Sequence, residues 1–430
     1  MTEMEVSLAQ HLSAAVLLHN QLINWLLADA LPLWDRHGVD RSGGGYFEAL
    51  TSLGPQAPIE VAGEERRGRV LARQIYVFDV GERLGWRSPM SNPVEHGCDY
   101  LFSRMGAGEG LFHTSIHAST YEPLATFSLY EHAFYLFALA RLSGSVTRQN
   151  RVHEAAVLCL KSLRQKLGKR LGGFEESTPS SLPLKSNPHM HLLEAAIAWA
   201  QATEGAAQQP WIELCRELIA LCLTRFIDPH SGALREYFDG EWRPMAGDAG
   251  RVVEPGHQFE WAWLLTEWAA FPHCSADERE QCLRAAVQLA DLGERWGVDP
   301  DRGVAINELW DDMTPKDSDA KLWPQTERVK AWCAILVTST GEAARIHACR
   351  MIAAAVRGML KYLRADVPGT WHELCTSQGN FPAGPSKASS FYHVVCAIEV
   401  LRKTVGADSR DMIYSPDSEF STGPVSEKNI

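Results

Sequence analysis

The sequence predicts an all-α protein, a single (α/α)6 barrel of about twelve helices that occupies residues 1–408. Three observations predict this fold. A short glycine-containing stretch recurs six times, two helix-like segments lie between successive stretches, and these segments alternate between amphipathic and almost wholly apolar. A helix with one polar face belongs on the outside of a fold, whereas a helix that is apolar all round belongs inside. Six outer and six inner helices account for the length better than three average domains would.

The six repeated stretches each begin with a glycine turn and continue with a few alternating apolar residues, as short hairpins do. From Gly45 the successive spacings are 65, 63, 59, 71 and 66 residues. The stretches are residues 44–48, 110–113, 172–176, 232–236, 303–308 and 369–373. We therefore expect short hairpins between the helix pairs.

The segments between the hairpins show helical periodicity. The predicted outer helices, whose faces are charged, are roughly 7–36, 92–105, 148–168, 210–227, 276–297 and 342–364. The predicted inner helices, which are nearly all apolar, are roughly 64–85, 125–142, 188–204, 256–271, 324–339 and 386–403. Residues 409–430, rich in Ser, Pro, Asp and Glu, are predicted to form a flexible tail.

Charge and composition exclude several classes of protein. The net charge of −12 and the lack of a strongly basic segment argue against a nucleic-acid partner. No apolar run is long enough to span a membrane, and the N-terminus is too polar for a signal peptide. The ten cysteines are scattered without a C-x-x-C pair, so we expect a reduced, cytoplasmic protein, either a monomer or a homodimer.

The fourth predicted inner helix begins with a distinctive run from Glu254 to Leu265. Proline at 255 suits the first helical position, and His257 and Glu260, three residues apart, share one helix face. The positive end of a helix favours neutral imidazole, which can accept a proton. A buried helix with an ordinary core histidine is the alternative interpretation.

Other inner helices also carry polar residues near their starts, which would meet at one mouth of the barrel. Arg73 is a cation in an apolar helix and requires either an internal ion pair or a polar ligand. Tyr130 is expected either to line the pocket or to pack in the apolar core as an ordinary structural residue. Asn187 is a good N-cap, and His189 and His191 after it point about 200° apart, so we expect only one of them to face the mouth.

The last two inner helices add further candidates. Trp323 offers a flat face on which a sugar can stack, Glu327 is either a pocket residue or only a first-turn carboxylate, and His393 enters an apolar helix. The His189/His191 pair is a possible metal site, although that pattern is commoner in extended segments. No metal site and no cofactor are predicted, because neither a convincing ligand set nor a nucleotide-binding loop is found.

These motifs resemble the N-acylglucosamine 2-epimerase superfamily, which includes cellobiose 2-epimerases and the mannose and sulfoquinovose aldose–ketose isomerases. The resemblance covers nearly the whole chain. Its most specific parts are Asn187-Pro-His-Met-His191, Pro255-Gly-His257-x-x-Glu260-Trp261 and Trp323-Pro-Gln-Thr-Glu327. The (α/α)6 barrel of that family agrees with the repeat count.

The resemblance implies specific roles for these residues. His257 and His393 would be the two acid/base residues, and Arg73 would face the oxygen on which negative charge develops. Glu260 would orient His257. The substrate pocket would be completed by Tyr130, Asn187, His191, Trp323 and Glu327.

The function expected is isomerisation of an unphosphorylated aldose to a ketose, with D-mannose and D-fructose the best candidates. Histidine can remove a proton beside a sugar carbonyl while a cation stabilises the enediolate. Returning the proton to the same carbon from the other face would instead make the enzyme a 2-epimerase acting on glucose-type, N-acylated or cellobiose-type sugars. A glycoside hydrolase, which needs two spaced carboxylates, and a sugar-binding protein without activity are the remaining alternatives.

Overall fold

The computed structural model describes residues 7–52, 58–60, 63–144, 147–363 and 365–413. The outer layer begins with a continuous helical run formed by α1 (Leu8–Asn24), a π-helical segment (Trp25–Ala30) and α2 (Leu31–His37). The other outer helices are α4 (Pro93–Arg104), α6 (Gln149–Leu167), α8 (Gln209–Leu221, continued by a π-helical segment, Cys222–Phe226), α10 (Ala276–Gly297) and α12 (Glu342–Tyr362). The inner helices are α3 (Gly68–Arg83), α5 (Leu129–Leu142), α7 (Ser186–Ala202), α9 (Pro255–Ala269), α11 (Leu322–Thr338) and α13 (Ala388–Ile413).

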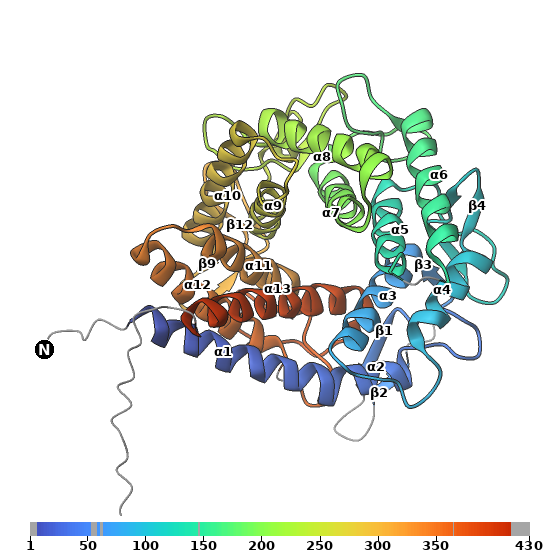
Figure 1. Ribbon diagram of the computed structural model, residues 1–430, viewed down its shortest axis with the longest axis horizontal. Helices are drawn as coiled ribbons and strands as arrows, with labels where there is room; N and C mark the ends of the chain where they lie inside the picture. The colour runs from blue at the N-terminus through green and yellow to red at the C-terminus, as the bar shows by residue number, and fades with distance from the viewer. Residues whose placement is uncertain (1–6, 53–57, 61–62, 145–146, 364, 414–430) are drawn as a thin grey trace, which may run out of the picture.

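These helices form the (α/α)6 barrel that the repeat predicts. Around the ring each inner helix contacts the next, and α13 returns to contact α3. Each outer helix from α4 onward packs on the inner helix before it, while α1 packs on α13 and α12 (Figure 1). α13 extends to Ile413, four residues past the start of the predicted tail at residue 409, and residues 414–430 lie outside the described part of the chain.

Short strands join neighbouring repeats at the mouth where the inner helices begin. Pairs form between β3 (Glu65–Arg67) and β6 (Ser115–His117), β7 (Leu184–Lys185) and β8 (Tyr237–Phe238), and β13 (Ala320–Lys321) and β14 (Leu374–Cys375). The seam between first and last repeats is closed by β1 (Ala49–Ser52), which pairs with β15 (Ser386–Lys387) and with β2 (Pro58–Glu60). The remaining pairs are β4 (Gly106–Gly108) with β5 (Leu111–Phe112), β9 (Val298–Asp299) with β10 (Val304–Ala305), and β11 (Glu308–Leu309) with β12 (Pro315–Asp317).

The repeated glycines are required by backbone conformation. Gly45, Gly110, Gly173, Gly232, Gly303 and Gly369 all have positive φ, between 66° and 85°. Only glycine adopts this region freely. At Gly173 space is also limiting, since an added Cβ would lie 3.0 Å from Nε2 of His189.

A buried polar side chain ties five inner helices to the preceding glycine stretch; we call these contacts latches. In α7, Nδ1 of His189 lies 2.9 Å from the carbonyl oxygen of Lys185, and Nε2 accepts a hydrogen bond from the Phe174 amide. The same pair of contacts, to the backbone four residues earlier and to the hairpin, is made by His132 in α5, Gln258 in α9 and Gln325 in α11. Before α13, Ser386 bonds the backbone of Trp371. The latches thus tie the starts of five of the six inner helices to the hairpins before them.

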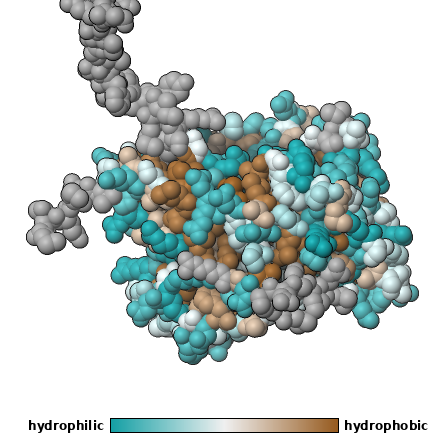
Figure 2. Space-filling view, turned by 90° about the horizontal axis from the view of Figure 1, so that it is seen from below, coloured by the Kyte–Doolittle hydropathy of each residue, from teal (hydrophilic) through white to brown (hydrophobic). Residues whose placement is uncertain are grey.

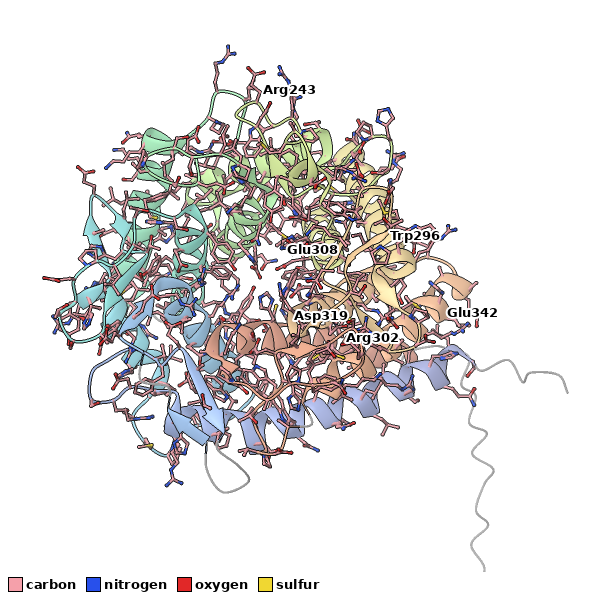
Figure 3. The ribbon with its side chains drawn as sticks, turned by 180° about the vertical axis from the view of Figure 1, so that it is seen from behind. Arg243, Trp296, Arg302, Glu308, Asp319 and Glu342 are labelled. Atoms are coloured by element: carbon pink, nitrogen blue, oxygen red, sulfur yellow. The ribbon has the colours of Figure 1, made fainter. Side chains whose placement is uncertain are left out.

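Side chains project from the inner helices into the centre of the ring (Figure 3). On the rim, Arg302 donates to the carbonyl oxygens of Ser318 and Thr376, and Asp319 accepts from the Ser377 amide. Figure 2 shows the molecule from below the view of Figure 1, and this face mixes hydrophilic and hydrophobic residues. No disulfide joins the ten cysteines, which are all buried. Among the described residues no helix is both long and apolar enough to cross a bilayer.

Candidate active site

A cavity of about 480 Å³ opens where the inner helices begin. Its lining includes eight of the nine predicted site residues: Arg73, Tyr130, Asn187, His191, His257, Glu260, Trp323 and His393. All six inner helices thus supply these side chains, from positions far apart in the sequence. The ninth, Glu327, does not line the cavity; it is fully buried behind His393.

His257 lies in the first turn of α9 between two carboxylates. Its Nδ1 is 2.8 Å from Oε2 of Glu236 and 3.7 Å from Oε2 of Glu254. Burial alone would lower the pKa of His257, but the charges of Glu236 and Glu254 and the hydrogen bond to Glu236 raise it to about 10. The expected neutral imidazole is therefore wrong, because nearby carboxylates outweigh the helix dipole. At neutral pH this ring carries a proton that it can donate.

His393 has the opposite electrostatic character. Its Nδ1 lies 2.8 Å from Oε1 of Glu327, yet the pKa of His393 is held well below its usual value by burial and by the charges of Arg73 and Lys330. The ring is therefore neutral at pH 7. With Nδ1 facing Glu327, Nε2 is the nitrogen available to a molecule in the cavity.

Trp323 lies between the two histidines. Its ring centroid is 5.0 Å from that of His257 and 6.1 Å from that of His393. Gly256 allows this approach, because a Cβ there would meet the Trp323 ring at 2.4 Å. On the other side of His257, Nδ2 of Asn187 lies 3.2 Å from Nε2. A protonated Nε2 can only donate, so it would bond the Asn187 amide group through the amide oxygen. The indole therefore contacts both the charged imidazole and the neutral one.

Arg73 is a buried cation that faces the cavity. Its guanidinium donates to the Tyr130 hydroxyl at 2.9 Å and to the Ser389 carbonyl oxygen at 3.1 Å, and it lies 4.2 Å from the Phe134 ring centroid. No ion pair of Arg73 with a described residue is found, so the internal ion pair considered from sequence does not form. A buried guanidinium held by neutral partners can stabilise negative charge on a bound molecule.

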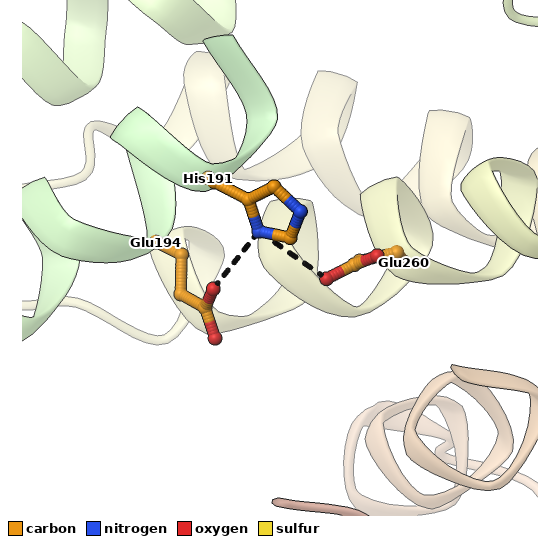
Figure 4. A group of neighbouring side chains, drawn as sticks. All are labelled: His191, Glu194 and Glu260. Atoms are coloured by element: carbon orange, nitrogen blue, oxygen red, sulfur yellow. Dashed lines mark hydrogen bonds and ion pairs between the residues drawn. The ribbon is translucent and has the colours of Figure 1, made fainter. Parts of the chain in front are cut away.

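Glu260 does not orient His257, contrary to the prediction. It lies instead 3.8 Å from Nδ1 of His191, which also contacts Glu194 at 3.3 Å (Figure 4). Burial and the charge of Glu327 raise the pKa of Glu260 to about 7. The two residues share a helix face as expected, but Glu236, on the preceding hairpin stretch, is closer to the His257 ring.

His189 and His132 are latch residues rather than cavity residues. As predicted, only the second histidine of the Asn187–His191 motif faces the cavity. Burial lowers the pKa of both His132 and His189 to about 4, so each remains the neutral form that donates from Nδ1 and accepts at Nε2.

Three groups of side chains place potential metal ligands within 4.8 Å of one another: His191/Glu194/Glu260, Glu236/Glu254/His257 and Glu260/Glu327/His393. The first and third surround Lys330, whose ammonium pairs with Glu327 and lies 3.7 Å from Glu260. A cation is thus already present there. The His189/His191 metal site does not form, since His189 is engaged in its latch.

Sequence reasoning missed Glu236, Glu254, Glu194 and Lys330 as parts of the site. Glu236 ends a repeated glycine stretch, and Glu254 immediately precedes the α9 motif, so both lay within segments already singled out. Lys330 was detectable as a lysine three residues after Glu327 on a predicted inner helix. No local pattern links Glu236 to His257, 21 residues later.

Comparisons with known proteins agree with this architecture. The family model described as N-acylglucosamine 2-epimerase (GlcNAc 2-epimerase) matches residues 45–397. A protein of Rhizobium meliloti (strain 1021) named mannose-6-phosphate isomerase is 38% identical over 88% of this chain and 95% of its own. The cellobiose 2-epimerase of Spirochaeta thermophila has a similar structure (TM-score 0.75, 21% identity, 92% of this chain and 98% of that one). So does a D-mannose isomerase (TM-score 0.75, 18% identity, 90% and 97%).

Proposed function

The chain belongs to the N-acylglucosamine 2-epimerase family, and we propose that it is an aldose–ketose isomerase that interconverts D-mannose and D-fructose. Its relatives are sugar isomerases and epimerases, so it is an enzyme of one of these two types. The observation that supports acid–base proton transfer is the opposite protonation of the two histidines, one charged and one neutral. The choice of a mannose isomerase is supported by the names of two relatives, a mannose-6-phosphate isomerase and a D-mannose isomerase. When the surroundings of two titratable groups shift their pKa values in opposite directions, one group can act as an acid and the other as a base.

In the proposed reaction, one histidine acts as a base that removes a proton from carbon, and the other acts as an acid that donates a proton to oxygen. Neutral His393 removes the proton from C2 of the open-chain aldose, while His257 donates its proton to O1 and Arg73 stabilises the developing charge. The product of this step is an enediol. His393 then returns a proton to C1 as O2–H gives its proton back to His257, which yields the ketose. A 2-epimerase acting through the same enediolate would instead have protonated His257 return a proton to C2 from the opposite face, so the two charge states are compatible with either outcome.

The test identifies the sugar that is formed and follows the hydrogen atom that leaves C2 of the substrate. D-Mannose labelled with deuterium at C2 is incubated with the protein, and the products are separated by chromatography and analysed by mass spectrometry. We expect fructose that keeps part of the deuterium at C1, because a single base carries it. Glucose with solvent hydrogen at C2 would instead identify a 2-epimerase.

A phosphorylated hexose is the second candidate substrate. Lys321 and Lys387, each just before an inner helix, line the cavity, and neither pairs with a described carboxylate within 4.0 Å. The Rhizobium relative's name is consistent with this reading. Glu254 and Glu373 line the same cavity, and their negative charge disfavours the dianionic phosphate group of a sugar phosphate. The unphosphorylated sugar therefore remains the first candidate substrate. If D-mannose 6-phosphate is preferred, Lys321→Ala and Lys387→Ala should raise its KM but leave that of D-mannose unchanged.

The proposed location is the cytoplasm. Ten buried cysteines without a disulfide support it, because oxidising compartments favour disulfide formation.

A further inference from the structure

Three nearly buried carboxylates meet at the floor of the catalytic cavity, and one of them, Glu260, belongs to its lining. Glu194, Glu260 and Glu327 are at most 4% exposed. They come from three inner helices, α7, α9 and α11. On the cavity side they contact His191 and His393, and on the far side the Tyr392 hydroxyl donates to Glu194. Ionised carboxylates so placed need a compensating cation.

That cation is Lys330, the one lysine among the described residues that is fully buried. It stands one helical turn after Glu327 and forms an ion pair with it, and its ammonium lies 3.7 Å from Oε1 of Glu260. The ammonium also lies 3.8 Å from the centroid of the Trp263 ring, which closes it off from solvent. Burial alone would lower the pKa of Lys330, but the surrounding carboxylates raise it, so it remains charged.

The charge of Lys330 decides which hydrogen-bonding form Glu327 takes. Burial raises the pKa of Glu327, and the charge of Lys330 opposes that rise. An ionised Glu327 can only accept, so it holds the proton on Nδ1 of His393 and leaves a lone pair on Nε2. A protonated Glu327 would donate to Nδ1. The neutral ring would then carry its proton on Nε2 and could not act as a base toward the cavity.

We propose that Lys330 is a positioning residue that keeps Glu327 ionised and thereby fixes His393 as the Nδ1–H tautomer. It touches no substrate and acts only through Glu327. This role rests on the proposed function, in which His393 is the base. The charged or titratable groups that face Lys330 or His393 are Glu194, Glu260, Glu327, His191, Arg73, Tyr392 and Cys396.

The test compares Lys330→Met, which removes the charge at similar length, with Glu327→Gln, whose amide donates to Nδ1. Both should lower kcat by at least about a hundredfold, the scale of a positioned base, while KM changes little. The double variant Lys330→Met/Glu327→Gln should lose no more than either single variant, because the two residues act as a unit. It also removes the unpaired buried carboxylate, so it should fold even if Lys330→Met does not. The matched control is Lys403→Met, a 63% exposed lysine near Glu399 on α13, which should retain normal kcat.

A second readout needs no substrate and therefore stands apart from the proposed function. Nitrogen NMR of histidine-labelled protein reports which ring nitrogen carries the proton, and His393→Gln identifies the signal. We expect the Nδ1–H form in the native protein and in Lys403→Met, and the Nε2–H form in the double variant. An unchanged tautomer or a normal kcat in the folded double variant would overturn the role of Lys330. If no sugar reacts but the tautomer changes as expected, the proposed function fails and the role of Lys330 in setting the tautomer stands.

Discussion

Nδ1 of His257 lies 2.8 Å from Oε2 of Glu236, in a contact that joins the start of α9 to the hairpin stretch before it. The equivalent distance from His393 to Glu327 is also 2.8 Å, yet the two histidines have opposite charge states. The difference lies in the neighbours. His257 has a second carboxylate, Glu254, whereas His393 has the cations Arg73 and Lys330. The same hydrogen-bonding arrangement thus accompanies a charged imidazole at one position and a neutral imidazole at the other.

Replacing Glu236 with Gln should lower the pKa of His257, because the amide carries no charge. As kcat/KM requires protonated His257, activity should fall as pH rises through that pKa, near 10 in the native protein. The alkaline limb should move to lower pH in Glu236→Gln. Rate profiles between pH 5 and 11 would measure this, with exposed Glu241→Gln as the control. An unmoved limb would assign the acid to another residue.

His257→Gln and His393→Gln should each lower kcat by at least about a hundredfold. Glutamine can still donate to the carboxylate behind each ring but cannot exchange protons with a sugar. His132→Gln and His189→Gln are the controls, since both histidines lie outside the cavity, and their turnover should remain near normal. Steady-state kinetics with D-mannose as the substrate would measure kcat for all four variants. Normal turnover in a folded His393→Gln protein would rule out the two-histidine mechanism.

Arg73→Lys should lose most activity although the charge is kept. The guanidinium reaches Tyr130, Ser389 and the cavity at once, and a lysine ammonium cannot match that planar fork. Loss of one such electrostatic contact typically costs about 10²–10³ in kcat. Tyr130→Phe removes only one partner of the guanidinium and should cost less. Comparable losses in the two variants would mean that Tyr130, not Arg73, meets the developing charge.

The latch histidines should make the fold sensitive to acid. Their pKa of about 4 in the folded protein lies below the value near 6.5 of an unfolded chain. Between these values the unfolded chain binds more protons, so the free energy of unfolding should fall as pH drops from about 6.5 to about 4. His132→Gln/His189→Gln should weaken this dependence while keeping the fold, because glutamine fills the same latch in α9 and α11. Urea unfolding at pH 7 and pH 5 measures both effects; an unchanged pH dependence would contradict the account.

The fold was predictable because a sixfold repeat imposes its pattern many times. The predicted inner helices differ from the observed starts by only a few residues, as at 256 for Pro255 and 324 for Leu322. Proline at the first turn and the change from amphipathic to apolar segments are local signals. The residues that line the cavity were equally predictable from the sequence, because every inner helix starts at the same mouth of the barrel.

The pairing of charges was not predictable in the same way. Spacing placed Glu260 on the face of His257, but two other carboxylates lie nearer to that ring and reverse its expected protonation. Glu327 shares its first turn with Trp323, yet it points behind the cavity, where Lys330 meets it. Such contacts depend on how far each helix is rotated, and periodicity in one helix carries no information about its neighbour.

The pairing of β1 with β15 has a consequence for the order of folding. Each latch spans at most 24 residues, so the repeats can form by local contacts along the chain. The seam instead joins Ala49 to Lys387, and Arg73 reaches Ser389 across 316 residues. Arg73 and His393 lie on either side of that seam, so the proposed base and the cation proposed to assist it come together only when the last repeat docks on the first. Recovery of catalysis during refolding should therefore lag behind recovery of helix content, and its rate should report the closure of the ring.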